Sequence, residues 1–532
     1  MVDILVVGSG GAVLCVAIEA KKQNKSVLVV SKTYPTQSQT SQAQGGINAV
    51  LSSKNNKDSI KNHINNTLKS AHKLADEKTI EYLCESAEEN IQWLDDIGVP
   101  FSRDKKNSIA QRSLGGASHP RACYSSDYTG LKILHTLYNT CLKENIEFLH
   151  EHMLLDFIIE NNTIKGVVCL DIVSGEIKQL LAKSVVVASG GYGGLYHGFT
   201  TNSSASTGDS IAIALRNKIK VSNMEYIQFH PTALRKSFVL ISESARGEGG
   251  YLVTKDEQRF VDELKPRDIV ARAIMEKIQK KEDVYLDLRD LGIEKIKQVM
   301  PQEYNLVKEF ANKELDQDLV AIMPAAHYTM GGIDTDMYGK TNIKNLYAVG
   351  ECASNGVHGA NRLGGNSLLE IVSFGRLVGK TVANTINNID KIEQKEYPKY
   401  QEHIKRIEEL FLMPNDVDFY RVKKLLGVEL YKDVGLFRTQ SRLEYALNKI
   451  RLWKRKFSRM GVTDKSREYN TNLVEFIEFS NLLDLAEVVV LSAIARKESR
   501  GAHYRTDYKE ESKEFAKKSV VQVKEKLEVG FV

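Results

Sequence analysis

Three segments between residues 228 and 370 combine histidine, arginine, carboxylate and glycine residues at a density that ordinary loops lack. The first covers 228–232 and continues at 242–250 and 265–268, the second covers 326–332, and the third covers 350–351 and 358–370. Each segment contains a histidine or an arginine, and the guanidinium fork of arginine matches the geometry of a carboxylate. A single histidine in such a place is typical of a structural position, but the three segments together predict a cage for a ligand that carries carboxylates.

A glycine-rich turn near the N-terminus predicts a site for a second ligand. The apolar run Val2–Val7 leads into Gly8-Ser9-Gly10-Gly11-Ala12, and a helical pattern and another apolar run at 26–30 follow. This order predicts a strand, a tight turn, a helix and a strand, with backbone N–H groups at the helix N-terminus holding a pyrophosphate. Two positions depart from the usual fingerprint. Val13 replaces its last small residue, and Ser31-Lys32 stands where a carboxylate usually binds ribose.

Another buried run, at 185–188, enters the glycines of 189–194 and is expected to return to the same cofactor. It lacks the spacing of a second complete fingerprint. We therefore expect a single nucleotide cofactor, FAD alone, rather than FAD together with a nicotinamide.

The elements that position these residues must form several folding units. At roughly 150 residues per domain, 532 residues suggest three or four units. The formal net charge of +5 is spread along the chain, so nucleic acid is not expected as a partner. The six cysteines include no Cys-x-x-Cys pair, and no metal site or iron–sulfur cluster is expected.

The apolar runs are about 5 to 8 residues long, well below the ~20 that a membrane-spanning helix needs. No basic leader or twin-arginine pair precedes the first apolar run. We expect no membrane span and, by default, a cytoplasmic location.

Longer stretches of the chain resemble the flavoprotein subunits of the succinate dehydrogenase and fumarate reductase family, which also includes L-aspartate oxidase. They run from Asp3 to about Tyr508 and comprise PT-x-S-x-T and AQGGI within 35–47, QFHPT, ARGEGG, PRD, HYTMGG, HGANRLGGNS and ESRGAHYR. The resemblance implies an α/β fold with a Rossmann-like FAD-binding domain split in the sequence, an inserted α+β capping domain and a helical C-terminal domain. We expect the FAD-binding domain at 1–225 and 325–390, the capping domain at 226–324 and the helical domain at 395–532.

Carried over position by position, the resemblance implies interconversion of fumarate and succinate. The residues expected on the substrate carboxylates are His230, His327 and Arg362, assisted by Thr232 or Ser242. Arg267 matches the family's proton-transferring arginine, and Glu243 and Arg246 match the other members of its proton relay. Reduction of fumarate needs a hydride from flavin N5 at one carbon and a proton at the other. Because the pKa of arginine exceeds ~12, an acidic role for Arg267 needs a buried site that is supplied with protons through a carboxylate.

The resemblance also implies the residues around the cofactor. They are Gly8, Gly10, Gly11, Ala12, Ser31, Lys32, Ser38, Gln39, Thr40, Gly45, Gly46, Ala188, Gly190, Gly191, Asp209, Glu351, Asn366, Ser367 and Leu368. Family members that attach FAD covalently use a histidine at the position of Gln39. Glutamine cannot form that bond, so we expect non-covalent FAD, which favours fumarate reduction over succinate oxidation. Leu131 and Ser210 replace the histidine and glycine that are common at their positions.

Two other functions remain open. L-aspartate oxidase also holds its flavin non-covalently, and the run 265–272 is similar to it. Aspartate oxidases, however, resemble one another in a glutamate before a Gly-Gly pair, where this chain has Leu114. A leucine cannot pair with the amino group of aspartate, and leaving that charge buried and unpaired costs on the order of several kcal/mol. The other alternative is a non-catalytic flavoprotein that serves as an assembly component, against which the complete set of family site residues argues.

The resemblance implies partners as well as a C4 dicarboxylate substrate. It implies an iron–sulfur subunit, and a membrane anchor is a further candidate. Because this chain has no cysteine pairs, any cluster is expected to lie in another chain. The chain would then lie in the cytoplasm, either free or peripheral on the cytoplasmic face of the inner membrane through those subunits. The basic helical stretch 447–456 is expected to be a solvated face, with a surface for the iron–sulfur subunit as the alternative.

Overall fold

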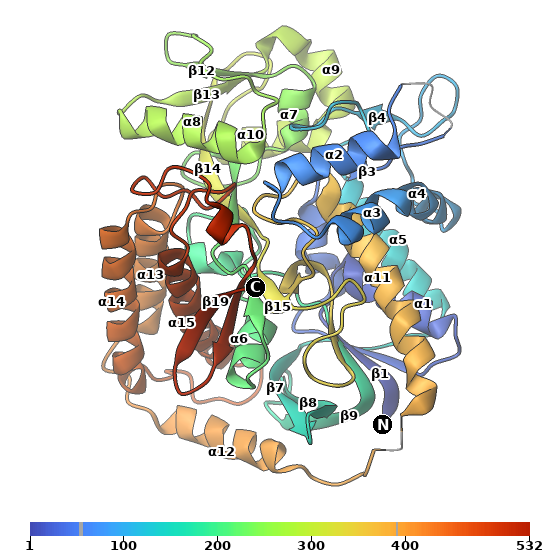
Figure 1. Ribbon diagram of the computed structural model, residues 1–532, viewed down its shortest axis with the longest axis vertical. Helices are drawn as coiled ribbons and strands as arrows, with labels where there is room; N and C mark the ends of the chain where they lie inside the picture. Colours follow the sequence, from blue (N-terminus) through green and yellow to red (C-terminus); the bar gives the residue numbers. More distant parts are fainter. Residues whose placement is uncertain (53–56, 390–391) are drawn as a thin grey trace.

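A seven-stranded sheet lies at the centre of the computed structural model, which describes residues 1–52, 57–389 and 392–532 (Figure 1). Its parallel strands are β1 (Val2–Val7), β2 (Val27–Val30), β6 (Glu147–Leu149), β9 (Ile177–Val187) and β16 (Leu346–Ala348). They lie side by side in the order β6-β2-β1-β9-β16, with β7 (His152–Glu160) and β8 (Thr163–Asp171) as antiparallel neighbours beyond β9. The third, second, first, fourth and fifth parallel strands are thus adjacent in that order, which is the arrangement of a nucleotide-binding doubly wound sheet.

Strand β9 belongs to both parts of the sheet. Residues 177–181 pair with β8, whereas 182–187 run parallel to β1 and 185–187 also pair with β16. Because β1 and β9 run in the same direction, their carboxyl ends reach the same edge of the sheet. The backbone N–H of Ala188 donates there to the carbonyl of Val7 at 2.8 Å, and the N–H of Gly8 donates to Val30 at 2.9 Å.

The sheet is buried on both faces, as the continuous apolar runs of its strands require. Ile4 and Val6 face a core shared with α1 (Gly11–Lys21), α5 (Thr129–Lys143) and α11 (Asn366–Thr385). Leu5 and Val7 point the other way, into the core that extends to the C-terminal helices. Helices α1 and α11 approach closely at Gly375, where a Cβ would lie 2.8 Å from Cys15 Cβ.

A separate antiparallel sheet in the order β11-β14-β13-β12 packs against four helices and lies at the top of Figure 1. Its strands are β11 (Ile227–Leu234), β12 (Tyr251–Thr254), β13 (Val284–Asp287) and β14 (Val320–Thr329), and its helices are α7 (Glu243–Gly247), α8 (Arg267–Gln279), α9 (Gly292–Val299) and α10 (Pro301–Ala311). The apolar core of this layer is built from residues between Leu234 and Ile322.

Four helices dominate the C-terminal part, three of them at the left of Figure 1 and α12 (Pro398–Leu412) along the bottom. The other three are α13 (Phe419–Asp433), α14 (Gln440–Lys456) and α15 (Thr471–Ala495). The chain then ends in a hairpin, β18 (Ser519–Val523) and β19 (Leu527–Phe531), which joins β10 (Val221–Ser222), β15 (Gly332–Asp334) and β17 (Ala353–Ser354) in a five-stranded sheet. The sequence predicts the helices and not this hairpin.

In the described part of the chain, four further helices and a short three-stranded sheet complete the fold. They are α2 (Ile60–Ser70), α3 (Glu77–Glu85), α4 (Ala87–Asp96), α6 (Asp209–Arg216) and the three-stranded sheet of β3 (Ile47–Asn48), β5 (Ala122–Cys123) and β4 (Gln111–Arg112). The expected boundary at residue 390 lies outside the described residues.

Candidate active site

One cavity lies between the carboxyl edge of the seven-stranded sheet and the four-stranded sheet. It is lined by the β1–α1 turn, the segment 37–46, the segment 203–210 and side chains of the four-stranded layer. Its volume is about 1650 Å³, including the part open to solvent. Since pockets for drug-sized ligands hold roughly 300–1,000 Å³, this cavity has room for a dinucleotide beside a small acid.

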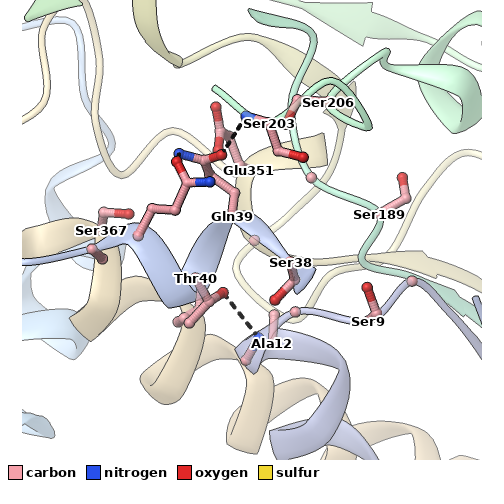
Figure 2. A pocket seen from close by; sticks show the side chains of 18 of the residues that line it. Ser9, Ala12, Ser38, Gln39, Thr40, Ser189, Ser203, Ser206, Glu351 and Ser367 are labelled. Carbon is pink, nitrogen blue, oxygen red and sulfur yellow. Dashed lines mark hydrogen bonds between the residues drawn. The ribbon is translucent and has the colours of Figure 1, made fainter. Parts of the chain in front are cut away.

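The backbone forms the nucleotide end of the cavity. Gly8 has a φ of +125°, and a Cβ there would lie 2.4 Å from the carbonyl oxygen of Ala188, so this turn requires glycine. The hydroxyl of Thr40 accepts the N–H of Gly11 at 3.2 Å, as the dashed line in Figure 2 shows. No acidic residue stands in the first turn of α1, so its N-terminal dipole is available to an anion. A glycine turn without side chains, followed by the N-terminus of α1, fits the pyrophosphate of a flavin dinucleotide.

Gln39 projects into the same cavity (Figure 2). Its Oε1 accepts the N–H of Ser203 at 2.7 Å, and its Nε2 donates to Gln42 at 3.4 Å. The side chain therefore ties the segment 39–42 to the segment at 203, and it offers no imidazole nitrogen for a covalent bond.

Lys32 lies two residues beyond the end of β2, where a carboxylate usually binds ribose. Its ammonium donates to Asp209 at 2.7 Å, to Glu478 at 2.5 Å and to the hydroxyl of Thr207 at 3.0 Å. Burial disfavours the charged lysine, but the two carboxylates outweigh burial and raise its pKa. The lysine therefore stays charged and links the cavity wall to α15 of the C-terminal part. Beside it, the Ser210 hydroxyl hydrogen-bonds to that of Ser189.

Glu243 pairs with two arginines at the other end of the cavity. Its Oε2 accepts Arg267 Nε at 3.1 Å and Nη2 at 2.8 Å, and its Oε1 accepts Arg246 Nη2 at 3.3 Å. Burial opposes ionisation, but the two guanidiniums outweigh burial and lower the pKa of Glu243. Arg246 Nη1 donates to the carbonyl of Glu263 at 2.5 Å, and the Glu263 carboxylate pairs at 2.7 Å with Arg259, which is 55% exposed. These contacts lead from the cavity to the surface.

Gln228 holds two cations at a fixed spacing without neutralising them. Its Oε1 accepts Arg267 Nη1 and Arg362 Nη2, each at 3.1 Å. Its Nε2 donates to Asn361 and to the carbonyl of Arg362, both at 2.8 Å. Burial and then Arg267 lower the pKa of Arg362 to about 10, so it remains charged at neutral pH. Two charged guanidiniums facing a cavity favour an anionic ligand.

Two histidines come from the paired strands β11 and β14. The rings of His230 and His327 lie 4.9 Å apart, and His327 Nδ1 contacts the hydroxyl of Thr201 at 2.8 Å. Burial and then Arg267 hold the pKa of both imidazoles well below their usual value. At neutral pH each ring is uncharged, so the histidines supply hydrogen bonds and the arginines supply the charge.

The aromatic ring of Tyr328 packs against the guanidinium of Arg362. The guanidinium lies 4.3 Å from the centre of the tyrosine ring, and the phenol donates to Glu370 Oε2 at 2.5 Å. The same oxygen contacts His358 Nε2 at 3.0 Å. Sequence reasoning missed Gln228, Tyr328 and Glu370 as site residues. The sequence feature that could have identified them is that each lies inside one of the polar segments that supply Arg267, His327 and Arg362.

The cavity brings together most of the site residues expected from the sequence, and four of them do not line it. Thr232 donates its hydroxyl to the carbonyl of Ile241 at 2.8 Å, and Arg246 lies behind Glu243. Asn366 hydrogen-bonds to Asn48 at the start of α11. At Gly191 a Cβ would lie 2.4 Å from Glu351 Oε1, so this position shapes the wall from outside the cavity.

Known proteins match this chain along nearly its whole length. A family model described as FAD binding domain matches residues 3–368, and one described as Fumarate reductase flavoprotein C-term matches residues 423–531. The 8-methylmenaquinol:fumarate reductase flavoprotein subunit of Wolinella succinogenes is 38% identical over 99% of this chain and 90% of its own length. The succinate dehydrogenase flavoprotein subunit of Rickettsia bellii is 36% identical over 95% and 90%.

A solved structure of Escherichia coli quinol fumarate reductase superposes with a TM-score of 0.94 at 32% identity, over 100% of this chain and 96% of that one. The chain belongs to the succinate dehydrogenase and fumarate reductase flavoprotein family. The predicted family, the α/β fold and the FAD-binding domain are thereby confirmed.

Family membership also corrects the expected limit of the resemblance. The sequence motifs end near Tyr508, but the C-terminal family model extends to residue 531 and so includes the hairpin of β18 and β19. Within the described residues of this flavoprotein, no helix is both long and apolar enough to span a membrane.

Proposed function

We propose that this flavoprotein interconverts fumarate and succinate, with fumarate reduction as the favoured direction. The observation that carries the proposal is the Arg267–Glu243–Arg246 chain, which ends at the cavity where Arg362, His230 and His327 also point. A four-carbon dicarboxylate offers two anionic groups to the two arginines. Arg267 already pairs with Glu243, whereas Arg362 pairs with no carboxylate among the described residues.

Different residues bind the substrate and transfer the proton. Arg362 and the neutral imidazoles of His230 and His327 bind and polarise the carboxylates, so that negative charge can build on the substrate. When bound, FAD supplies the hydride for one carbon of the double bond. Arg267 gives a proton to the other carbon and recovers one through Glu243 and Arg246 from the surface side.

The wall beside this site favours a substrate without an amino group. Leu114 lines the cavity and is 2% exposed, so it offers no partner to an ammonium. This observation supports fumarate and succinate over aspartate.

We also propose that residues 226–324 act as a capping domain over the FAD-binding domain. Their own apolar core and the position of α7 and α8 above the cavity support this division. By analogy with the quinol fumarate reductase relatives, an iron–sulfur subunit would pass electrons to the flavin, and a membrane anchor would hold the complex on the cytoplasmic face of the membrane.

An anaerobic assay of fumarate with a reduced dye, run beside an aerobic assay of L-aspartate, tests the proposal. We expect fumarate-dependent dye oxidation and no hydrogen peroxide from aspartate. Peroxide formation from aspartate, with no fumarate turnover, would assign L-aspartate oxidase activity instead. If fumarate neither turns over nor changes the flavin spectrum, the chain would be a non-catalytic component.

Acid precipitation tests the state of the cofactor. With Gln39 at the position of the covalent histidine, we expect the flavin to remain in the supernatant. Flavin that stays with the precipitated protein would contradict non-covalent binding.

A further inference from the structure

A buried cluster of two carboxyl groups and one guanidinium lies where the four-stranded layer meets the FAD-binding region. Glu303 belongs to α10, Asp127 precedes α5, and Arg112 belongs to β4. Their exposed fractions are 1%, 0% and 5%. None of the three has a part in the reaction as described above.

Glu303 contacts the FAD-binding region through its backbone N–H and the start of α7, in its own layer, through its side chain. Its N–H donates to Asp127 Oδ2 at 2.9 Å, and its Oε1 accepts the N–H of Ser242 at 2.8 Å. The guanidinium of Arg112 donates to the carbonyls of Gln44, Gly45 and Ser126 at 2.7–2.8 Å, all in the FAD-binding region. Glu303 is therefore the member of the cluster that belongs to the four-stranded layer, whereas Asp127 and Arg112 belong to the FAD-binding region.

The contact at Ser242 places Glu303 behind the proton relay. Ser242 is the N-cap of α7, where its hydroxyl accepts the N–H of Ser244 at 3.1 Å. Helix α7 begins at the next residue, Glu243, and also carries Arg246. Because α7 has only five residues, a shift of its first turn would move both relay side chains.

The cluster carries more acid than base. Each member keeps one buried polar atom that has no hydrogen-bond partner among the described residues, namely Glu303 Oε2, Asp127 Oδ1 and Arg112 Nη1. Other charged or titratable side chains near Arg112 are Glu248 and Tyr124, whose ring lies 4.4 Å from the guanidinium. With both carboxyls ionised, one guanidinium would face two buried negative charges, and such a buried imbalance is costly.

We propose that Glu303 is a positioning residue, which in its neutral form seats the cap on the FAD-binding region and fixes α7 for proton transfer. The inference rests on the proposed function, because α7 matters to turnover only if Glu243 relays protons.

The protonation state follows from the surroundings. Burial, and then Asp127, raise the pKa of Glu303 to about 8 from the usual 4.5, and burial also raises the pKa of Asp127. A raised pKa in the seated state means that the seated cap binds a proton which the opened cap releases. Seating is therefore strongest below about pH 4.5 and weakens progressively as the pH rises through about 8.

The test uses three variants of the full chain. Glu303→Gln keeps the Oε1 acceptor and stays neutral at every pH. Glu303→Ala is also neutral but removes the acceptor, and Glu309→Gln is a control at an exposed position of the same helix. The first readout is amide hydrogen exchange at Ser242–Ser244, which needs no turnover, and the second is the pH profile of kcat/KM for fumarate.

We expect the protection factor at Ser242–Ser244, which is the intrinsic exchange rate at each pH divided by the observed rate, to fall between pH 6 and 9 in the wild type. It should be low at every pH in Glu303→Ala, and high and constant with pH in Glu303→Gln. The Glu303→Ala variant should lose roughly 10- to 100-fold in kcat/KM through the misplaced relay. Glu303→Gln should stay within about threefold of the wild type and retain its rate above pH 8, since it has no proton there to lose.

Equal exchange and equal pH profiles in Glu303→Gln, Glu309→Gln and the wild type would overturn the inference. So would a Glu303→Gln variant as impaired as Glu303→Ala. A wild-type protein without fumarate turnover would instead refute the proposed function, and the exchange data would still decide whether Glu303 seats the cap.

Discussion

The two ends of the cavity are built in different ways. At the nucleotide end, one strand-to-helix turn exposes backbone N–H groups, and glycine is required because a Cβ at Gly8 would collide with Ala188. At the dicarboxylate end, side chains converge from β11, α7, α8, β14 and the loop before α11. The first site is local in sequence and depends on the absence of side chains, whereas the second depends on long-range packing of charged ones.

This difference predicts different failures on mutation. A side chain added at the nucleotide end should release the flavin, because the cradle is filled. A side chain removed at the dicarboxylate end should stop the chemistry and leave the flavin bound, because the backbone cradle is untouched.

Arg267→Ala should give the largest effect. Loss of a positioned proton donor lowers turnover by roughly 10²- to 10⁴-fold, while the flavin-to-protein ratio should stay that of the wild type. Steady-state fumarate reduction and the flavin absorbance of the purified protein measure the two quantities. Lys280→Ala, at an exposed position just beyond α8, is the control. Near-normal turnover in Arg267→Ala or Arg267→Lys, with flavin retained, would remove Arg267 from the proton-donor role.

Gly8→Ala should give the opposite pattern. The residue would need a strained φ that costs about 1–3 kcal/mol, and its Cβ would lie 2.4 Å from a backbone oxygen. We expect the purified protein to have lost most of its flavin, as measured by the absorbance ratio. Gly530→Ala is a matched control, because a Cβ there meets no heavy atom within 4 Å. Full flavin content in Gly8→Ala would mean that the turn is not the pyrophosphate cradle.

The same difference explains how far the sequence could predict the structure. The order strand, Gly8-Ser9-Gly10, helix, strand is a local pattern, and the structure has β1, α1 and β2 in those places. Gln228 contacts Arg267, 39 positions away in the sequence, and Arg362, 134 positions away. No spacing pattern in the sequence predicts these contacts. The hairpin of β18 and β19 is not predicted for a similar reason, since β18 pairs with β10 about 300 residues earlier and the turn between β18 and β19 is charged.

Gln228→Leu tests the side-chain end at a residue that does not belong to the relay. Leucine leaves Arg267 Nη1 and Arg362 Nη2 without their shared acceptor, at a cost of roughly 1–3 kcal/mol for buried donors. We expect kcat/KM for fumarate to fall by about 5- to 150-fold, with flavin content unchanged. Loss of flavin from this variant would show that the two ends of the cavity are not independent.

Tyr328→Phe should have the smallest effect, and it separates the ring from its hydroxyl. The variant keeps the aromatic face 4.3 Å from the Arg362 guanidinium and removes only the bond to Glu370. The hydrogen bond to Glu370 is expected to strengthen the cation–π contact between Tyr328 and Arg362. Its loss should raise the KM for fumarate about 2- to 10-fold with little change in kcat, the effect of one hydrogen bond.

Glu370→Gln is the matched variant, because it keeps an acceptor for the phenol and removes the charge. If KM rises in Tyr328→Phe but not in Glu370→Gln, the hydrogen bond of the phenol matters and the charge of Glu370 does not. A fall in kcat as large as that of Gln228→Leu would mean that Tyr328 orients the reacting groups. The position of Arg362 would then depend on the ring of Tyr328 as much as on Gln228, and the dicarboxylate end would include Tyr328 and Glu370, which lie behind Arg362.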